Sequence, residues 1–201
     1  MAEHSVRRMR ITGRETDMSS RLYKLGIIVG RFQTFHLGHQ DMIDTAIELC
    51  EDVGVFIGSS QESGTEKNPF SYEVRESLIR RIYGGSISIF PLPDIGVGNN
   101  AKWGEYVLKN VSDRFGRLPE LFISGKEGRR ESWLSSEAGM DTAELYIPKS
   151  IEISASEMRG FFIKNDADSW RRYTDPRLWD SFKELRRTVM DSCMNTDTAS
   201  I

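Results

Sequence analysis

Short apolar runs alternate with amphipathic segments along most of this chain, and no other feature limits the possible folds as strongly. YKLGIIVG at 23–30 is rich in apolar and β-branched residues and ends in glycine, which predicts a buried strand. HQDMIDTAIELC at 39–50 then carries apolar residues at helical spacing. The alternation predicts βαβ units, and therefore a parallel sheet with helices on both faces. By the same criteria we expect strands at 53–60, 86–93, 120–125 and 143–148, and helices at 72–83, 101–111, 154–165 and 175–190.

The expected architecture is an α/β domain with a Rossmann-like, doubly wound parallel sheet of about five strands and a C-terminal helical segment. We place this domain at 21–190, between a flexible N-terminal extension at 1–20 and a flexible tail at 191–201, because both ends are polar. The net charge of −3 argues against a protein held on nucleic acid by bulk electrostatics. No apolar run reaches membrane-span length and the two cysteines lack CxxC spacing, so we expect a cytoplasmic protein without a membrane partner.

The segment GRFQTFHLGHQ, directly after the first strand, holds two histidines, two glycines and an arginine. Ligands of parallel sheets bind outside the carboxyl ends of the strands, so this turn is a candidate site. Glycines let a phosphate approach closely, and a helix N-terminus offers free N–H groups to an anion. His36, His39 and Arg31 add side-chain donors and charge. An isolated pair of this kind could equally be ordinary loop and cap residues, whereas zinc would need further ligands, and only His4 remains as a histidine.

GRFQTFHLGH resembles the HxGH turn of the nucleotidylyltransferase superfamily. Its longer form resembles G-R-F/M-Q-P-F-H-x-G-H of the archaeal-type nicotinamide-nucleotide adenylyltransferases, with Thr34 in place of the usual proline. The resemblance implies that Arg31, His36 and His39 act on the α-phosphate of ATP. It also implies ATP contacts from Gly30, Phe32, Gln33 and Gly38, and a substrate contact from Phe35.

A second match, IEISASEMRG at 151–160, resembles the superfamily signature I-S-x-T/S-x-x-R. Ser154 with Glu157 three residues on predicts a capping box, and Arg159 would project from the first turns of that helix. Alone, the pattern is more typical of a plain helix cap with a surface arginine. Beside the HxGH turn it implies a site for the leaving pyrophosphate at Arg159. The implied ATP contacts near this helix and after the fourth strand are Ile153, Ser154, Ser156, Ser124 and Gly125, and the charged Lys126, Arg129 and Arg130 that follow could instead form a solvated loop.

Two further segments resemble the acceptor side of the same family. FIGSSQESGTEKNPFSYEVR at 56–75 is similar to I-G-S-A-Q-x-S-H-T-x-x-N-P-F-T-x-x-E-R, with Gly64 for the usual histidine and Val74 for the usual glutamate. PLPDIGVGNNAKWGEYV at 91–107 resembles P-x-x-D-I-x-x-N-x-x-W. Trp103 could stack on the flat cationic pyridinium ring of the acceptor. A lone tryptophan in a helix is more often a core residue, and that alternative stays open. The implied substrate contacts are Ser59, Gln61, Asn68, Arg75, Asp94 and Trp103.

The resemblance implies transfer of AMP from ATP to nicotinamide mononucleotide, giving NAD and pyrophosphate by direct in-line attack. Mg²⁺ would enter with ATP, held by phosphates and water, so we expect no metal ligands from the chain. The implied partners are ATP and a pyridine mononucleotide, and multimers are common in the family. Two alternatives remain. One is another phosphate acceptor, such as nicotinate mononucleotide or phosphopantetheine, and the other is a non-catalytic NAD- or ATP-sensing module.

Overall fold

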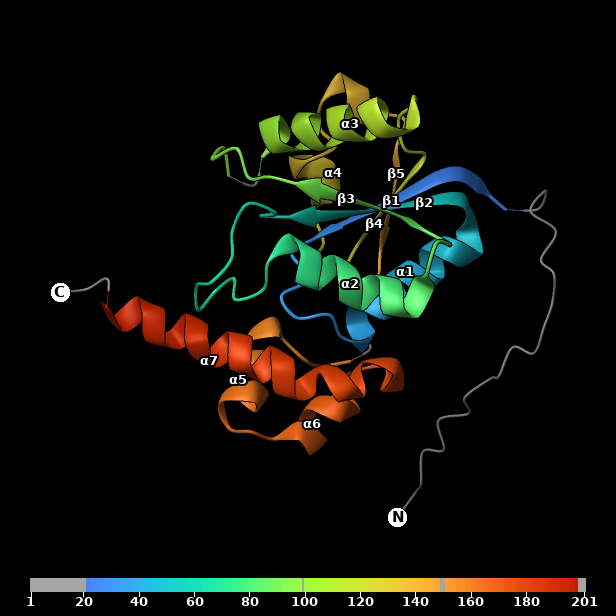
Figure 1. Ribbon diagram of the computed structural model, residues 1–201. Helices are drawn as coiled ribbons and strands as arrows, with labels where there is room; N and C mark the ends of the chain where they lie inside the picture. Colours follow the sequence, from blue (N-terminus) through green and yellow to red (C-terminus); the bar gives the residue numbers. More distant parts are fainter. Residues whose placement is uncertain (1–20, 99, 149–150, 199–201) are drawn as a thin grey trace, which may run out of the picture.

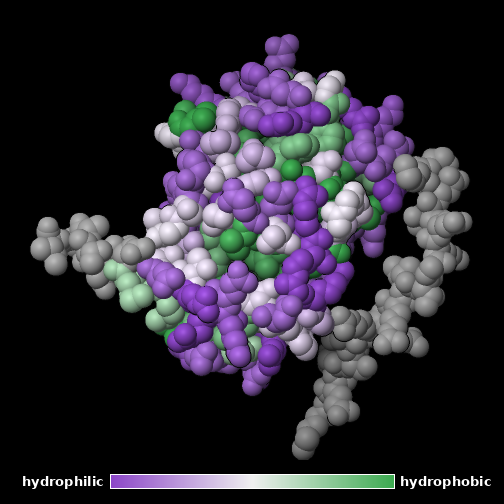
Figure 2. All heavy atoms as spheres, in the orientation of Figure 1, coloured by the Kyte–Doolittle hydropathy of each residue, from purple (hydrophilic) through white to green (hydrophobic). Residues whose placement is uncertain are grey.

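The computed structural model describes residues 21–98, 100–148 and 151–198. The extension expected at 1–20 lies outside the described residues. Hydrophilic side chains cover most of the face shown in Figure 2, with apolar residues exposed in scattered patches. No helix of the described segments is long and apolar enough to cross a membrane.

Five parallel strands form one sheet in the order β3-β2-β1-β4-β5, which confirms the expected fold class. Their bounds are Tyr23–Gly30 for β1, Cys50–Gly58 for β2, Ser88–Leu92 for β3, Leu121–Ser124 for β4 and Ala143–Tyr146 for β5. The chain adds β2 and β3 on one side of β1 and then β4 and β5 on the other side. The carboxyl ends of β1 and β4 therefore meet at the topological switch point, where such sheets bind ligands.

Helices cover both faces of this sheet (Figure 1). α1 and α2 lie on one face and α3 and α4 on the other, while α5, α6 and α7 pack together on the side of α1 and α2. The bounds are Leu37–Leu49 for α1, Tyr72–Tyr83 for α2, Ala101–Phe115 for α3, Arg129–Ser132 for α4, Ala155–Ile163 for α5, Ala167–Arg172 for α6 and Phe182–Thr198 for α7, with short 3₁₀ turns η2 at Glu137–Gly139 and η3 at Pro176–Ser181.

The core divides into two apolar clusters, one on each face of the sheet. Neighbouring residues of β1 show the division, since Ile28 packs with the α1, α2 and α5–α7 side and Ile27 packs with α3. Successive side chains of a strand point to opposite faces, so an unbroken apolar run buries both faces. This is why the strands read as continuous apolar runs in the sequence.

The C-terminal region differs from the helix expected at 175–190. Asp175 accepts a hydrogen bond from the amide of Arg177, and Pro176 opens the 3₁₀ turn η3 before α7 begins at Phe182. α7 then continues to Thr198, through most of the segment expected to be a tail. The short helix α6 was not expected, although Asp166 caps it by accepting a hydrogen bond from the amide of Ser169.

Candidate active site

The turn between β1 and α1 places two histidine rings against each other at the switch point. His36 is the N-cap of α1, and its Nδ1 accepts a hydrogen bond of 3.1 Å from the amide of Gly38. Because Nδ1 accepts, the ring proton of neutral His36 lies on Nε2. The rings of His36 and His39 stack with centroids 3.8 Å apart. The two side chains therefore act as one surface.

Aromatic residues of the turn support His39 from below. The His39 ring lies 4.8 Å from that of the buried Phe32 and 5.8 Å from that of the buried Phe35. Burial, and then the neighbouring His36, lower the pKa of His39 well below its usual value. His39 is therefore a neutral donor or acceptor at pH 7. The sequence implied ligand contacts for Phe32 and Phe35, but both are at most 2% exposed and pack beneath the His39 ring inside the turn.

The N-terminal amides of α1 differ from the expectation of free donors. The amide of Leu37 donates to the carbonyl of Tyr173 at 2.8 Å, and the amide of Gly38 donates to His36. Protein groups thus already satisfy the first two amides of the helix. An anion at this turn would be met chiefly by side chains, with the positive end of the helix dipole behind them.

Two arginines lie at the same turn, Arg31 within it and Arg159 in contact with its backbone. Arg31 is exposed and donates a long hydrogen bond of 3.4 Å to the side chain of Asn68. Arg159 extends from α5, donating to the carbonyl of Gln33 at 3.1 Å and to the hydroxyl of Ser156 at 3.2 Å. Burial, and then the charge of Arg31, lower the pKa of Arg159. Two neighbouring guanidinium groups that repel each other form a site suited to a polyphosphate.

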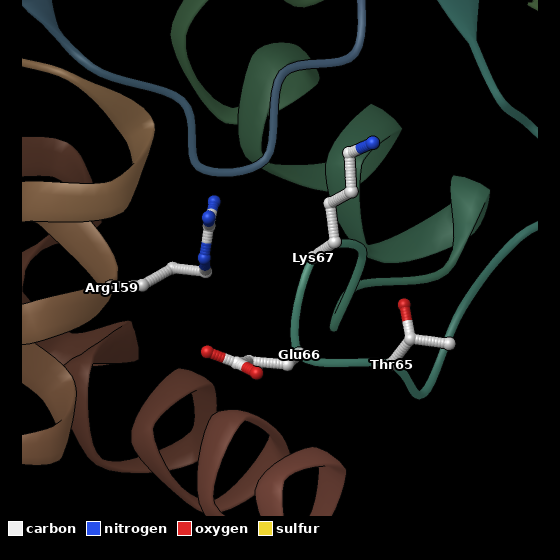
Figure 3. Close-up of a pocket in the computed structure, with 4 residues that line it drawn as sticks. All are labelled: Thr65, Glu66, Lys67 and Arg159. Atoms are coloured by element: carbon white, nitrogen blue, oxygen red, sulfur yellow. The ribbon is translucent and has the colours of Figure 1, made fainter. Parts of the chain in front are cut away.

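Arg159 also lines a pocket of about 370 Å³ (Figure 3). The other lining residues come from the loop between β2 and α2 and are Thr65, Glu66 and Lys67. The pocket thus joins two of the segments that sequence motifs singled out, although Arg159 lies more than 90 residues along the chain from the loop. None of the three loop residues was among the expected contacts, although Thr65 matches the threonine of the family pattern and Glu66 and Lys67 carry charges.

Gln33 and Arg75 hold the site together from the inside. Gln33 is buried and pairs with the backbone of Phe70, donating to its carbonyl at 2.8 Å and accepting from its amide at 2.9 Å. Arg75 is 0% exposed, and its guanidinium donates to four backbone carbonyls, which belong to Arg31, Gly58, Ser59 and Ser71. Both side chains were expected to contact ligands. Their observed hydrogen bonds are structural and tie the strand ends to the turn.

A second cluster lies at the ends of β2 and β3. Ser59 donates to the carboxylate of Asp94 at 2.5 Å. Gln61 accepts from the amide of Asp94 at 3.0 Å and donates to its carbonyl at 3.4 Å. The structure therefore brings together three of the expected substrate contacts, and Asp94 and Gln61 remain exposed for a ligand. Asn68, a fourth, is buried under the adjoining loop.

Trp103 has a different environment from the open stacking surface that the sequence suggested. It is 7% exposed and packs at 6.0 Å against the ring of Trp133. The side chain of Asn100 caps α3 by accepting a hydrogen bond from the amide of Trp103. Its neighbour Asn99 lies outside the described residues. With only 7% of its surface exposed, Trp103 offers a ligand little area for stacking.

The remaining expected ATP contacts lie at the carboxyl ends of β1 and β4 and at the start of α5. Ser124 donates to the carbonyl of Lys126, and Ser154 forms the predicted capping box with Glu157, which is confirmed. Gly30 and Gly125 are half-buried, Ser156 is exposed, and Ile153 is buried.

The arginines that follow β4 form no solvated loop. Arg129 stacks over Trp133 at 4.0 Å, and the guanidinium of Arg130 donates to the carbonyls of Gly139 and Thr142.

The chain is similar to known proteins over most of its length. A family model described as cytidylyltransferase-like matches residues 27–161. A nicotinamide-nucleotide adenylyltransferase of Thermococcus sibiricus is 42% identical over 178 residues, which cover 86% of this chain and 90% of the relative. This chain belongs to the cytidylyltransferase-like family, among the nicotinamide-nucleotide adenylyltransferases. The residues that match the family model include the turn that the structure places at the switch point.

Further relatives and solved structures agree. The Pyrococcus furiosus nicotinamide-nucleotide adenylyltransferase is 31% identical over 81% of this chain and 85% of its own. A match of 41% identity to the Saccharolobus solfataricus enzyme covers 41% of this chain and half of that relative. A bifunctional NMN adenylyltransferase/ADP ribose pyrophosphatase of Francisella tularensis has the same fold, with a TM-score of 0.71 and 21% identity over 88% of this chain and 53% of its own. Membership in the family thus rests on whole-domain similarity as well as on short motifs.

Proposed function

We propose that this chain transfers AMP from ATP to nicotinamide mononucleotide, giving NAD and pyrophosphate. The observation that carries the proposal is the stacked pair His36 and His39 at the switch point, in a turn that also holds Arg31 and that Arg159 contacts. Imidazole donors and fixed positive charges at one point suit a phosphorus centre on whose oxygens charge develops. The relatives that align over most of the chain are named for this reaction.

The reaction needs positioning more than covalent chemistry. The 5′-phosphate of the mononucleotide is ionised at neutral pH, so its attack on the α-phosphorus of ATP needs no general base. We assign His36 Nε2–H and the His39 ring to the α-phosphate oxygens, with Arg31 beside them. Arg159 would take the leaving pyrophosphate from the other side. Each group stabilises charge that increases along the in-line path, which is the part of the barrier that a protein can lower.

Mg²⁺ enters this proposal as part of the ATP substrate. Within residues 21–98, 100–148 and 151–198, no group of three or more histidine, cysteine, aspartate or glutamate side chains could hold a metal ion. Magnesium commonly binds through substrate phosphates and water rather than through a full set of protein ligands. The Francisella protein was solved with AMP and a manganese ion.

Pyrophosphate release from Mg-ATP tests the proposal, with nicotinamide and nicotinate mononucleotides as parallel acceptors. We expect turnover with nicotinamide mononucleotide, and the ratio of kcat/KM values for the two acceptors measures the preference for amide over carboxylate. Phosphopantetheine serves as the control acceptor from another branch of the superfamily. Protein that binds ATP but releases no pyrophosphate with any pyridine mononucleotide would contradict the proposal and favour a nucleotide-sensing module.

A further inference from the structure

The loop between β2 and α2 presents an acidic side chain to the arginine expected to hold the leaving group. Within the loop, the amide of Asn68 donates to the hydroxyl of Thr65 at 3.0 Å, and the amide of Thr65 donates to the carbonyl of Asn68 at 3.3 Å. This turn places Glu66 and Lys67 at its tip. Figure 3 shows the Glu66 carboxylate directed across the pocket toward the Arg159 guanidinium, while Lys67 extends away from Glu66.

The base of this loop is anchored, and its tip is open to solvent. Asn68 is 3% exposed, donates to the carboxylate of Glu62 and accepts from Arg31. Glu66 and Lys67 are both exposed. A fixed base holds the tip opposite Arg159, while solvent exposure leaves the two charged side chains free to change rotamer. The loop backbone therefore sets the position of Glu66, and its exposed carboxylate can turn toward Arg159 or away from it.

Arg159 is influenced by charges of both signs. Arg31 acts on Arg159 as a like charge and Glu66 acts on it as an opposite charge. Without a nucleotide, Glu66 thus offsets part of the repulsion between the two arginines. A bound pyrophosphate places several negative charges at the same guanidinium, where they repel the Glu66 carboxylate.

We propose that Glu66 is a resident counter-ion of Arg159 that competes with pyrophosphate and so speeds its release. The inference rests on the proposed function, because it assigns Arg159 to the leaving pyrophosphate. Glu66 acts on the substrate through Arg159 and is not itself a catalytic residue. Its replacement by a neutral residue would strengthen binding of the polyphosphate and slow product release.

Binding of inorganic pyrophosphate by calorimetry, at low ionic strength, tests this role with Glu66→Gln and Lys67→Gln as matched variants. Both replace an exposed charge on the same loop tip with the same side chain. We expect Glu66→Gln to bind pyrophosphate about twofold to fivefold more tightly, the range of a partly screened charge contact. Lys67→Gln should bind it equally or more weakly. In an Arg159→Gln background the Glu66→Gln effect should disappear.

Steady-state kinetics complete the test. If NAD forms, the inhibition constant for pyrophosphate should fall in Glu66→Gln by the same factor as the dissociation constant. An unchanged dissociation constant, or an effect that persists without Arg159, would overturn the inference even in an active enzyme. Tighter binding in a protein that forms no NAD would support the counter-ion while refuting the proposed function, so the two failures are distinguishable.

Discussion

Replacing Arg75 with methionine should lower the free energy of unfolding, because the buried Arg75 side chain holds the backbone of the site in place. The Arg75 guanidinium donates to the carbonyls of Gly58 and Arg31 at 2.8 and 2.9 Å, and to those of Ser59 and Ser71 at 3.1 Å each. A hydrogen bond to a charged group contributes about 1.5–3 kcal/mol, and burying the guanidinium offsets part of the sum of four. Methionine fills much of the volume but leaves four carbonyls without a donor. We expect a loss of about 3–5 kcal/mol in the free energy of unfolding.

Thermal and urea unfolding measure this loss. For a domain of this size we expect Tm to fall by roughly 6–20 °C in Arg75→Met. Arg75→Lys keeps the charge but not the planar set of donors, so its Tm should lie between those of Arg75→Met and the wild type. The reasoning would be refuted by an Arg75→Met protein with a wild-type Tm and a much raised KM for the mononucleotide, because Arg75 would then be a substrate ligand.

Three further changes follow from particular contacts. Gly104→Ala would place a Cβ 1.8 Å from the carbonyl oxygen of Trp133, so the free energy of unfolding should fall by about 3 kcal/mol or more, whereas Gly85→Ala, with no atom within 4 Å, should change it by less than about 1 kcal/mol in urea titrations. The pKa of His39 is lower in the folded protein than in the unfolded chain. As pH falls, the His39 ring is therefore protonated in the unfolded chain before it is protonated in the folded protein. Stability is therefore full above about pH 6.5 and falls below it by up to about 1.4 kcal/mol per pH unit, a slope that urea titrations should find reduced in His39→Gln. Asp94→Asn should raise KM for the mononucleotide about tenfold in initial-rate assays, because it weakens an exposed acceptor, and an unchanged KM would remove Asp94 from the acceptor site.

Local patterns predicted much of the fold. The bounds of β1 at Tyr23–Gly30 and of α2 at Tyr72–Tyr83 agree with the sequence expectation residue for residue. Both segments combine a strong apolar pattern with a clear end, a glycine in β1 and the Ser71 cap of α2. The capping box of α5 is equally local, since its two side chains are three residues apart.

Tertiary contacts decided what the sequence could not show. Arg75 lies in an amphipathic helix, where an arginine ordinarily faces solvent, and only the folded turn supplies the carbonyls that surround it. Trp103 matched a family pattern, yet its environment depends on Trp133, which is thirty residues away. The position of Glu66 across the pocket from Arg159 depends on loop geometry that no periodic pattern encodes. Motif positions were predictable, but the division between ligand contacts and internal supports was not.

The most direct test of the account is the rate of NAD formation from Mg-ATP and nicotinamide mononucleotide by wild-type protein and by His39→Ala, with ATP binding measured in both. Loss of a transition-state donor should lower kcat by about 10²–10³-fold while ATP still binds. A His39→Ala protein that forms NAD at nearly the wild-type rate would contradict the assignment of the stacked histidines to the α-phosphate.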